Sequence, residues 1–152
     1  MPVHWARRTI TRPAAAGGEA HEATDLQGFE QLRRQDAFAL SWHANGLYYG
    51  IRRTELAGLQ QGRWVLVNGS RGHLPHVLQS YPGLQMVHIT ADPATLVQRL
   101  TQRQRETPAQ IQERVERASA FVLPHGVIEI SNNGTLDQAG QAFLLALQKL
   151  DA

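Results

Sequence analysis

The run Trp64-Val65-Leu66-Val67-Asn68-Gly69-Ser70-Arg71 passes directly from four apolar residues into a polar loop. Two further runs, Leu84–Ile89 and Val127–Ile130, have a similar apolar character, and small polar residues follow each of them. Short apolar runs bounded by turn residues are typical of strands that are buried on both faces. Because helix-forming stretches lie between these runs, the pattern predicts an α/β fold with a mostly parallel sheet flanked by helices.

Helices and one hairpin are predicted around these strands. Asp25, Asp92 and Thr107 stand where helix N-caps are expected, and proline follows the last two of them. The run His43-Ala44-Asn45-Gly46 separates strands expected at 37–42 and 47–52, which is a strong hairpin signal. The helical stretches are expected at 26–35, 55–61, 73–80, 93–104, 108–120 and 136–150.

In open α/β sheets, ligands bind beyond the carboxyl ends of the strands. The loops at these positions are 68–71, 90–92 and 131–134, and all three are rich in polar or small residues. The sequence therefore predicts a binding site formed by these loops.

The composition indicates one folded domain, because the 152 residues are 42% hydrophobic and 18% charged. There is no cysteine, which excludes disulfides and thiolate metal sites. The sequence contains neither an apolar run that could span a bilayer nor a recognisable secretory signal. These observations predict a cytoplasmic location and no membrane partner.

Arginine dominates the basic residues, since Lys149 is the single lysine among 15 basic side chains. The planar guanidinium group binds phosphate through two hydrogen bonds, so phosphorylated ligands are expected. An arginine-rich codon usage is an alternative explanation. Acidic and basic residues are interspersed along the chain, which argues against a nucleic-acid-binding face.

Nucleophilic and metal-dependent hydrolysis receive little support. The sequence has no G-x-S-x-G and no H-E-x-x-H motif. His73 and His76 are three residues apart with Pro75 between them, so a metal site is not predicted.

Five strings then point to a family: RRTITRP followed by GGE, FALSWHANGLYYGI, VLVNGSRGHLP, LVQRLTQRQRETPAQIQERVERA and EISNNGTL. In this order they resemble the guanylate-kinase-like branch of the P-loop kinases, and within it the bacterial ribose 1,5-bisphosphate phosphokinases. The resemblance covers nearly the whole chain. It implies a phosphotransferase that uses ATP and Mg²⁺ to convert ribose 1,5-bisphosphate into 5-phosphoribosyl diphosphate (PRPP) in phosphonate breakdown.

The resemblance also assigns residues to the acceptor site. Arg12 and Tyr49 match residues that hold the acceptor phosphate in guanylate kinases, and Glu19 matches the acid of a Gly-Glu pair. Leu40 replaces a Glu that reads guanine, and Ile51 replaces a Thr that also contacts the base. An acceptor without a nucleobase fits both losses. Further candidates for binding the acceptor are Ser41, His43, Asn45, Asn68, Ser70 and Arg71.

The segment 93–121 resembles the lid of these kinases. There the resemblance places Arg103 and Arg105 near the ATP phosphates and Arg114 near the transferred group, and it places Asn132 in the adenine-side loop. The alternative is that Arg99, Arg103, Arg105, Arg114 and Arg117 only pair with nearby Glu106, Glu113 and Glu116. The acceptor-binding lobe is expected at 7–53 within a single domain, 1–152.

The chain departs from the family in one respect: it contains no G-x-x-x-x-G-K-[ST] loop. The family has a strand, this loop and a helix before the position of His4. We therefore expect a sheet that lacks a central strand, little kinase activity, and no evident protein ligand for Mg²⁺. A late start site, a truncated gene and a retained acceptor-binding role are the competing explanations. The competing functions are another nucleoside monophosphate kinase relative and a non-catalytic binding module.

Overall fold

The computed structural model describes residues 3–14, 19–122 and 126–151. The chain forms two compact units, Met1–Pro82 and Gly83–Ala152, and each is described by itself. The single domain with a lobe at 7–53 and a lid at 93–121 stays a prediction.

The first unit contains a four-stranded sheet with the order β3-β2-β5-β4. Its strands are β2 (Arg8–Ile10), β3 (Glu22–Ala23), β4 (Phe38–Ala44) and β5 (Leu47–Arg52). β5 pairs antiparallel with both β2 and β4, whereas β3 pairs parallel with β2. This mostly antiparallel sheet carries Ser41, His43 and Tyr49, three of the residues that the sequence predicts to bind the acceptor.

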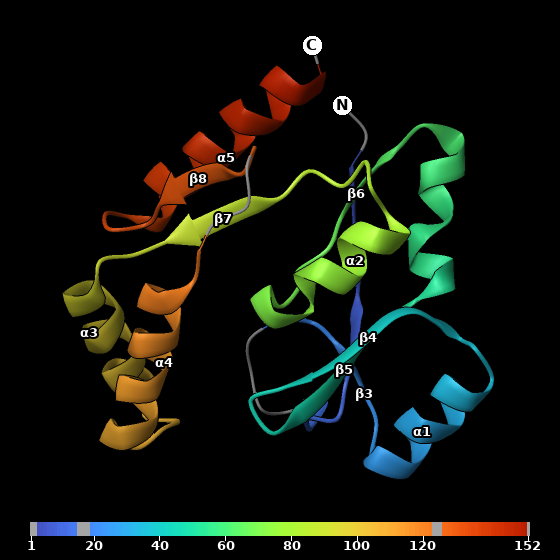
Figure 1. Cartoon of the computed structure of the whole chain (residues 1–152), viewed down its shortest axis with the longest axis horizontal. Coiled ribbons are helices and arrows are strands. Elements are labelled where there is room, and N and C mark those ends of the chain that lie inside the picture. The colour runs from blue at the N-terminus through green and yellow to red at the C-terminus, as the bar shows by residue number, and fades with distance from the viewer. Residues whose placement is uncertain (1–2, 15–18, 123–125, 152) are drawn as a thin grey trace. The chain divides into compact units, whose positions relative to one another are not determined.

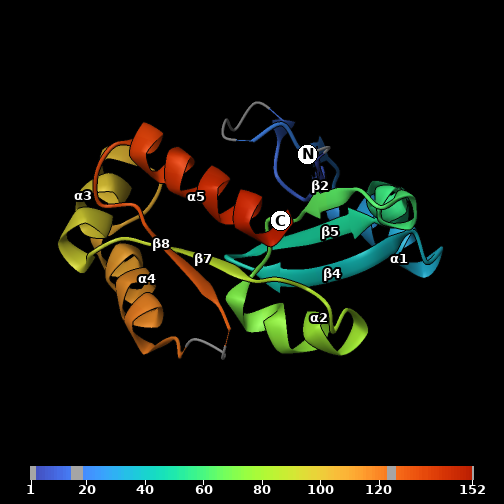
Figure 2. The same ribbon diagram turned by 90° about the horizontal axis from the view of Figure 1, so that it is seen from above.

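The predicted hairpin joins β4 and β5, which lie side by side in Figures 1 and 2. Its turn is Asn45-Gly46, with φ values of 54° and 74°. Both residues adopt the left-handed conformation that a two-residue hairpin turn requires. The hairpin prediction is therefore confirmed, although β4 begins one residue later and ends two residues later than expected.

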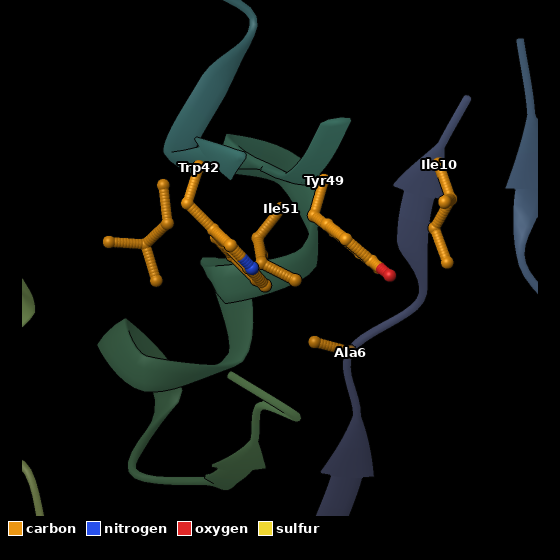
Figure 3. Packing of buried hydrophobic residues seen from close by; sticks show 6 residues of the cluster. Ala6, Ile10, Trp42, Tyr49 and Ile51 are labelled. Atoms are coloured by element: carbon orange, nitrogen blue, oxygen red, sulfur yellow. The ribbon is translucent and has the colours of Figure 1, made fainter. Parts of the chain in front are cut away.

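The two faces of this sheet have different neighbours. Ala6, Ile10, Leu40, Trp42, Tyr49 and Ile51 form one buried cluster, seen in Figure 3. On the other face, Phe29 of α1 (Leu26–Arg34) stacks on Phe38 with ring centroids 4.7 Å apart. Asp25 caps α1 by accepting a hydrogen bond from the Gly28 amide at 2.7 Å, as predicted.

The rest of the first unit contains a short pair of parallel strands, two 3₁₀ helices and one α-helix. β1 (Val3–Trp5) pairs with β6 (Trp64–Leu66). The 3₁₀ helix η2 (Arg53–Gln61) stands where a short helix was expected. After β6 come η3 (Arg71–His73) and α2 (Leu74–Ser80).

The second unit contains the parallel pair β7 (Val87–Thr90) and β8 (Ile128–Ser131) with three helices. They are α3 (Pro93–Arg103), α4 (Pro108–Ala120) and α5 (Leu136–Asp151). α3 and α4 pack side by side around Leu100, Ile111 and Val115, and α5 runs beside β8 (Figure 2).

Two local predictions for this unit need correction. β7 begins at Val87 rather than Leu84, because Leu84 and Gln85 are exposed and form no strand pairs. Asp92 occupies the N-cap position of α3, but its side chain accepts no capping hydrogen bond. Thr107 does cap α4, through a reciprocal pair of bonds with Gln110.

Outside the four-stranded sheet, the described residues form one parallel pair in each unit, β1–β6 and β7–β8. Both pairs expose large apolar side chains, since Trp5 of β1 is 62% exposed and Ile89 of β7 is 56% exposed. The missing central strand stays a prediction.

Candidate active site

The predicted site residues divide between the two units. All of the predicted acceptor-binding residues belong to the first unit. The predicted lid residues and Asn132 belong to the second. We call these two groups the acceptor half-site and the nucleotide half-site, after the roles that the sequence predicts for them.

Arg8 contacts both Glu19 and Tyr49 in the acceptor half-site. Arg8 donates from Nε to Glu19 Oε2 at 3.0 Å and from Nη2 to Oε1 of the same carboxylate. The Arg8 guanidinium also lies over the Tyr49 ring, with Cζ 4.8 Å from the ring centroid. Arg8 therefore links the predicted residues Glu19 and Tyr49, while its own charge is balanced by Glu19.

Arg12 is differently placed, although it follows Arg8 by only four residues. Its Nε atom is buried and has no hydrogen-bond partner in the described part of the chain. Its Nη2 atom lies 3.4 Å from Nδ1 of His21, a neutral or cationic group rather than a carboxylate. In the described part of the chain, Arg12 therefore lacks the close carboxylate partner that Arg8 has in Glu19.

Aromatic rings extend the acceptor half-site from Tyr49. The Trp42 and Tyr49 rings are nearly parallel at 6°, with centroids 5.5 Å apart, and His73 also stacks on Trp42, at 5.5 Å. Burial, together with the nearby His76, holds the pKa of His73 below its usual value. A neutral His73 ring stacks on Trp42 without the desolvation cost of a charge.

Leu40 and Ile51 are cross-strand partners on β4 and β5. Leu40 is 9% exposed and Ile51 is fully buried, and both belong to the cluster shown in Figure 3. Because both side chains are apolar, neither Leu40 nor Ile51 can form a hydrogen bond with the edge of a base.

Three predicted residues lie elsewhere on the hairpin. Side chains alternate between the faces of a strand, so Ser41 and His43 face away from the side of the sheet that Trp42 occupies. His43 stacks on Tyr48 at 4.5 Å, and Tyr48 in turn contacts Phe29 of α1. Asn45 is exposed in the turn. The structure thus does not bring Ser41, His43 and Asn45 together with Tyr49.

The loop after β6 carries Asn68, Ser70 and Arg71. Asn68 is exposed, whereas Ser70 and Arg71 are half-buried. The Ser70 carbonyl accepts a hydrogen bond from the His73 amide at 3.2 Å, which starts η3. Because His73 stacks on Trp42, this loop is tied to the aromatic group of the acceptor half-site.

In the nucleotide half-site, one carboxylate joins two predicted lid arginines. Glu106 accepts from Arg114 Nε at 2.8 Å and lies 3.4 Å from Arg103 Nη2. Arg103 ends α3 and Arg114 belongs to α4, so Glu106 ties the two helices together. Arg105 lies exposed between the two helices. Two guanidinium groups therefore converge on one anion, which is the arrangement a phosphate also needs.

The loops after β7 and β8 are bonded to each other. The backbone N–H of Asn132 donates to the Thr90 carbonyl at 2.6 Å. The backbone N–H of Asp92 donates to Oδ1 of the Asn133 side chain, also at 2.6 Å. Arg99 of α3 donates to the carbonyls of Asn132 and Gly134. Arg99, which the sequence grouped with possible phosphate ligands, therefore holds the loop that carries Asn132.

Three contributors were not predicted from the sequence: the buried His21, the loop-holding role of Arg99, and the bridging role of Glu106. None of them belongs to a motif with a fixed spacing. Only Glu106 had a signal in the sequence. It lies within a run of arginines, and one alternative was that these arginines pair with nearby glutamates.

Neither a metal cluster nor a membrane span is evident in residues 3–14, 19–122 and 126–151. No group of three or more His, Cys, Asp or Glu side chains there could hold a metal ion. No helix in those ranges is both long and apolar enough to cross a bilayer. We assign no chemical step to the metal.

The ion pair of Glu19 predicts a pH-dependent stability. The hydrogen bond from Arg8 lowers the pKa of Glu19 against the opposing effect of burial, with help from the charges of Arg8 and Arg12. A carboxyl group whose pKa is lowered by folding stabilises the protein above its unfolded pKa of about 4.5 and loses that contribution as the pH falls further.

We therefore expect Glu19→Gln to be less stable than the parent chain at pH 7, with the difference vanishing at strongly acidic pH. Urea unfolding at several pH values measures this. Glu113→Gln, an exposed change on α4, is the control and should show no such convergence. A difference that stays constant with pH would contradict the prediction.

Comparison with known proteins identifies the class of fold first. Guanylate kinase from Anaplasma phagocytophilum superposes with a TM-score of 0.68 and 15% identity, covering 97% of this chain and 76% of that one. The chain has a guanylate-kinase-like α/β fold. No family model matches the sequence.

Curated relatives then identify the family. Ribose 1,5-bisphosphate phosphokinase of Agrobacterium fabrum is 42% identical over 147 residues, which are 96% of this chain and 80% of that protein. The enzyme of the same name from Chromobacterium violaceum is also 42% identical, over 93% of this chain and 77% of its own length. The chain belongs to the ribose 1,5-bisphosphate phosphokinase family.

Proposed function

We propose that this chain provides the acceptor and lid parts of a kinase that phosphorylates ribose 1,5-bisphosphate with ATP to give PRPP. The family membership supports the substrate. The observation in the fold that best supports it is the buried pair Leu40–Ile51, because those positions would need polar groups to select guanine. Leaving base-edge hydrogen-bonding groups unpaired is costly, so an acceptor without a base fits this site.

In the proposed reaction, an oxygen of the 1-phosphate attacks the γ-phosphorus of ATP. The bond between this phosphorus and the oxygen that bridges it to the β-phosphate breaks, and ADP leaves. The attacking oxygen already carries charge, so no strong general base is required. The protein then contributes mainly by holding both substrates and by balancing charge.

We assign acceptor binding to Arg12, Glu19 and Tyr49, with Asn68, Ser70 and Arg71 in the loop after β6. Tyr49 supplies a hydroxyl group, and Glu19 acts through its ion pair with Arg8. Ser41, His43 and Asn45 stay predictions, since their positions on the hairpin give no argument for a role.

We assign ATP to the nucleotide half-site. Asn132 lies in a loop fixed by Arg99 and Thr90, which suits the edge of a base. Arg103, Arg105 and Arg114 neutralise phosphate charge. Because Arg103 and Arg114 share Glu106, a phosphate group competes with this carboxylate for them.

This competition predicts that Glu106→Gln binds inorganic tripolyphosphate about fivefold more tightly than the parent chain at low salt, the effect of removing one partly exposed ion-pair partner. Titration calorimetry measures the change. Glu113→Gln removes the same charge from an exposed site on α4 and should give less than twofold. Weaker binding by Glu106→Gln would show instead that Glu106 holds the arginines in place for the anion.

The sequence contains no phosphate loop, so we also propose that these 152 residues alone have little kinase activity. The test joins residues 3–152 to the part of the Agrobacterium fabrum relative that the alignment leaves uncovered, about a fifth of that protein. With ATP, Mg²⁺ and ribose 1,5-bisphosphate, we expect PRPP from this chimera and none above background from the chain alone.

Other outcomes favour the competing functions. Phosphorylation of GMP by the chimera, without PRPP, would support a nucleoside monophosphate kinase relative. Binding of ribose 1,5-bisphosphate with no transfer by the chimera would support a binding module.

A further inference from the structure

His21 is a buried residue that the proposed function does not use. It is 5% exposed and, with Thr9, is one of the two buried polar residues in the described part of the chain. A buried polar side chain is costly unless hydrogen bonds satisfy it. The partners of the His21 ring therefore indicate why a polar group stands there.

Both ring nitrogens of His21 are close to Arg12. Nε2 lies 2.9 Å from the Arg12 carbonyl oxygen, and Nδ1 lies 3.4 Å from Arg12 Nη2. A carbonyl only accepts hydrogen bonds and a guanidinium only donates them, so the Nε2–H tautomer satisfies both contacts. In this form a single ring fixes the main chain and the side chain of the same arginine.

Two further groups lie close to His21. Arg7 Nη2 donates to the His21 carbonyl at 3.2 Å, so two guanidinium groups are near. The Glu19 carbonyl lies 3.2 Å from Nδ1 and is the acceptor that a protonated Nδ1 would use. The Glu19 carboxylate is engaged by Arg8. Of the two groups that face Nδ1, only the Arg12 guanidinium can donate a hydrogen bond to it.

A neutral imidazole can orient a guanidinium without cancelling its charge. Arg8, by contrast, is held by a carboxylate and is neutralised as a pair. We propose that His21 is a positioning residue that orients Arg12 for a phosphate of the acceptor while leaving the full charge of Arg12 available. This inference rests on the acceptor role of Arg12 in the proposed function.

The first test measures the affinity of the 152-residue chain for ribose 1,5-bisphosphate by titration calorimetry. His21→Leu, which keeps the bulk and removes both hydrogen bonds, should weaken binding about tenfold. His21→Gln, whose uncharged amide offers one donor and one acceptor, should recover most of the affinity. His21→Glu can still hold Arg12 but balances its charge, so it should bind as weakly as His21→Leu.

Thermal unfolding separates positioning from a purely structural role. If His21 only stabilised the fold, affinity would follow stability across the three variants, and His21→Glu would bind well wherever it is stable. Equal affinity of His21→Leu and the parent chain would overturn the inference.

A second measurement does not depend on how the variants fold. The ¹⁵N chemical shifts of the His21 ring in the parent chain should show the Nε2–H tautomer, with the Nδ1 resonance shifted in Arg12→Ala. An Nδ1–H tautomer would overturn the inference even if the chain bound no acceptor. If Arg12→Ala leaves acceptor affinity unchanged, or if the parent chain does not bind, the proposed acceptor site fails. If Arg12→Ala weakens binding and His21→Leu does not, only the inference fails.

Discussion

Replacing Ile51 by Thr is expected to lower the free energy of unfolding by about 2–4 kcal/mol, the sum of a lost methyl group and a buried hydroxyl without a partner. Ile51 is fully buried beside Leu40 and Ile10, so there is no water for the hydroxyl to contact. This substitution installs the residue type that the guanylate-kinase resemblance places at Ile51. It should cost stability without producing GMP binding, since the cross-strand partner Leu40 is also apolar.

Valine is the matched control, because it has the shape of threonine without the hydroxyl group. Ile51→Val should cost only about 0.5–1.5 kcal/mol. Ile89→Thr, at a side chain that is 56% exposed, should change stability little. Urea unfolding compares the three. Equal stability of the Thr and Val variants at position 51 would show that the site accepts a polar group, which would weaken the argument for a base-free acceptor.

Local patterns were sufficient to predict most of the helices and strands. Asn45-Gly46 predicted the hairpin turn correctly, and Thr107 with Pro108 predicted the start of α4. The boundary of β7 was missed because Leu84 is apolar yet exposed, and an apolar run does not reveal which residues find a strand partner. Hydrogen-bond pairing across the chain decides that boundary, and no local pattern encodes it.

The site was less predictable, since its contacts join residues far apart in the sequence. The resemblance indicated Arg12 and Tyr49, but the contacts of Arg8 with Glu19 and the Tyr49 ring depend on how β2 and β5 pair. The same applies to Arg99, which lies 33 residues from Asn132 in the chain and donates to its carbonyl. A row of arginines does not reveal which are held by internal acceptors. The distances in the folded chain separate them.

That distinction between arginines leads to the largest expected effect on binding. Arg12→Ala should weaken the affinity for ribose 1,5-bisphosphate about 10- to 100-fold, the range for losing a charge-assisted hydrogen bond to phosphate. The affinity for ADP should be unchanged, because the residues assigned to the nucleotide belong to the other unit. Arg12 has a buried Nε without a partner in the described part of the chain, so a ligand oxygen there would satisfy an otherwise unpaired donor.

Arg34→Ala is the control for net charge, because Arg34 is an exposed residue at the end of α1. If long-range attraction alone drew the bisphosphate to the protein, both substitutions would weaken binding equally, and added salt would remove the difference. If Arg12 binds a phosphate directly, its loss persists at high salt while that of Arg34 does not. Equal losses of acceptor and ADP affinity in Arg12→Ala would contradict the division into two half-sites, since a guanidinium that served both ligands could not belong to the acceptor alone.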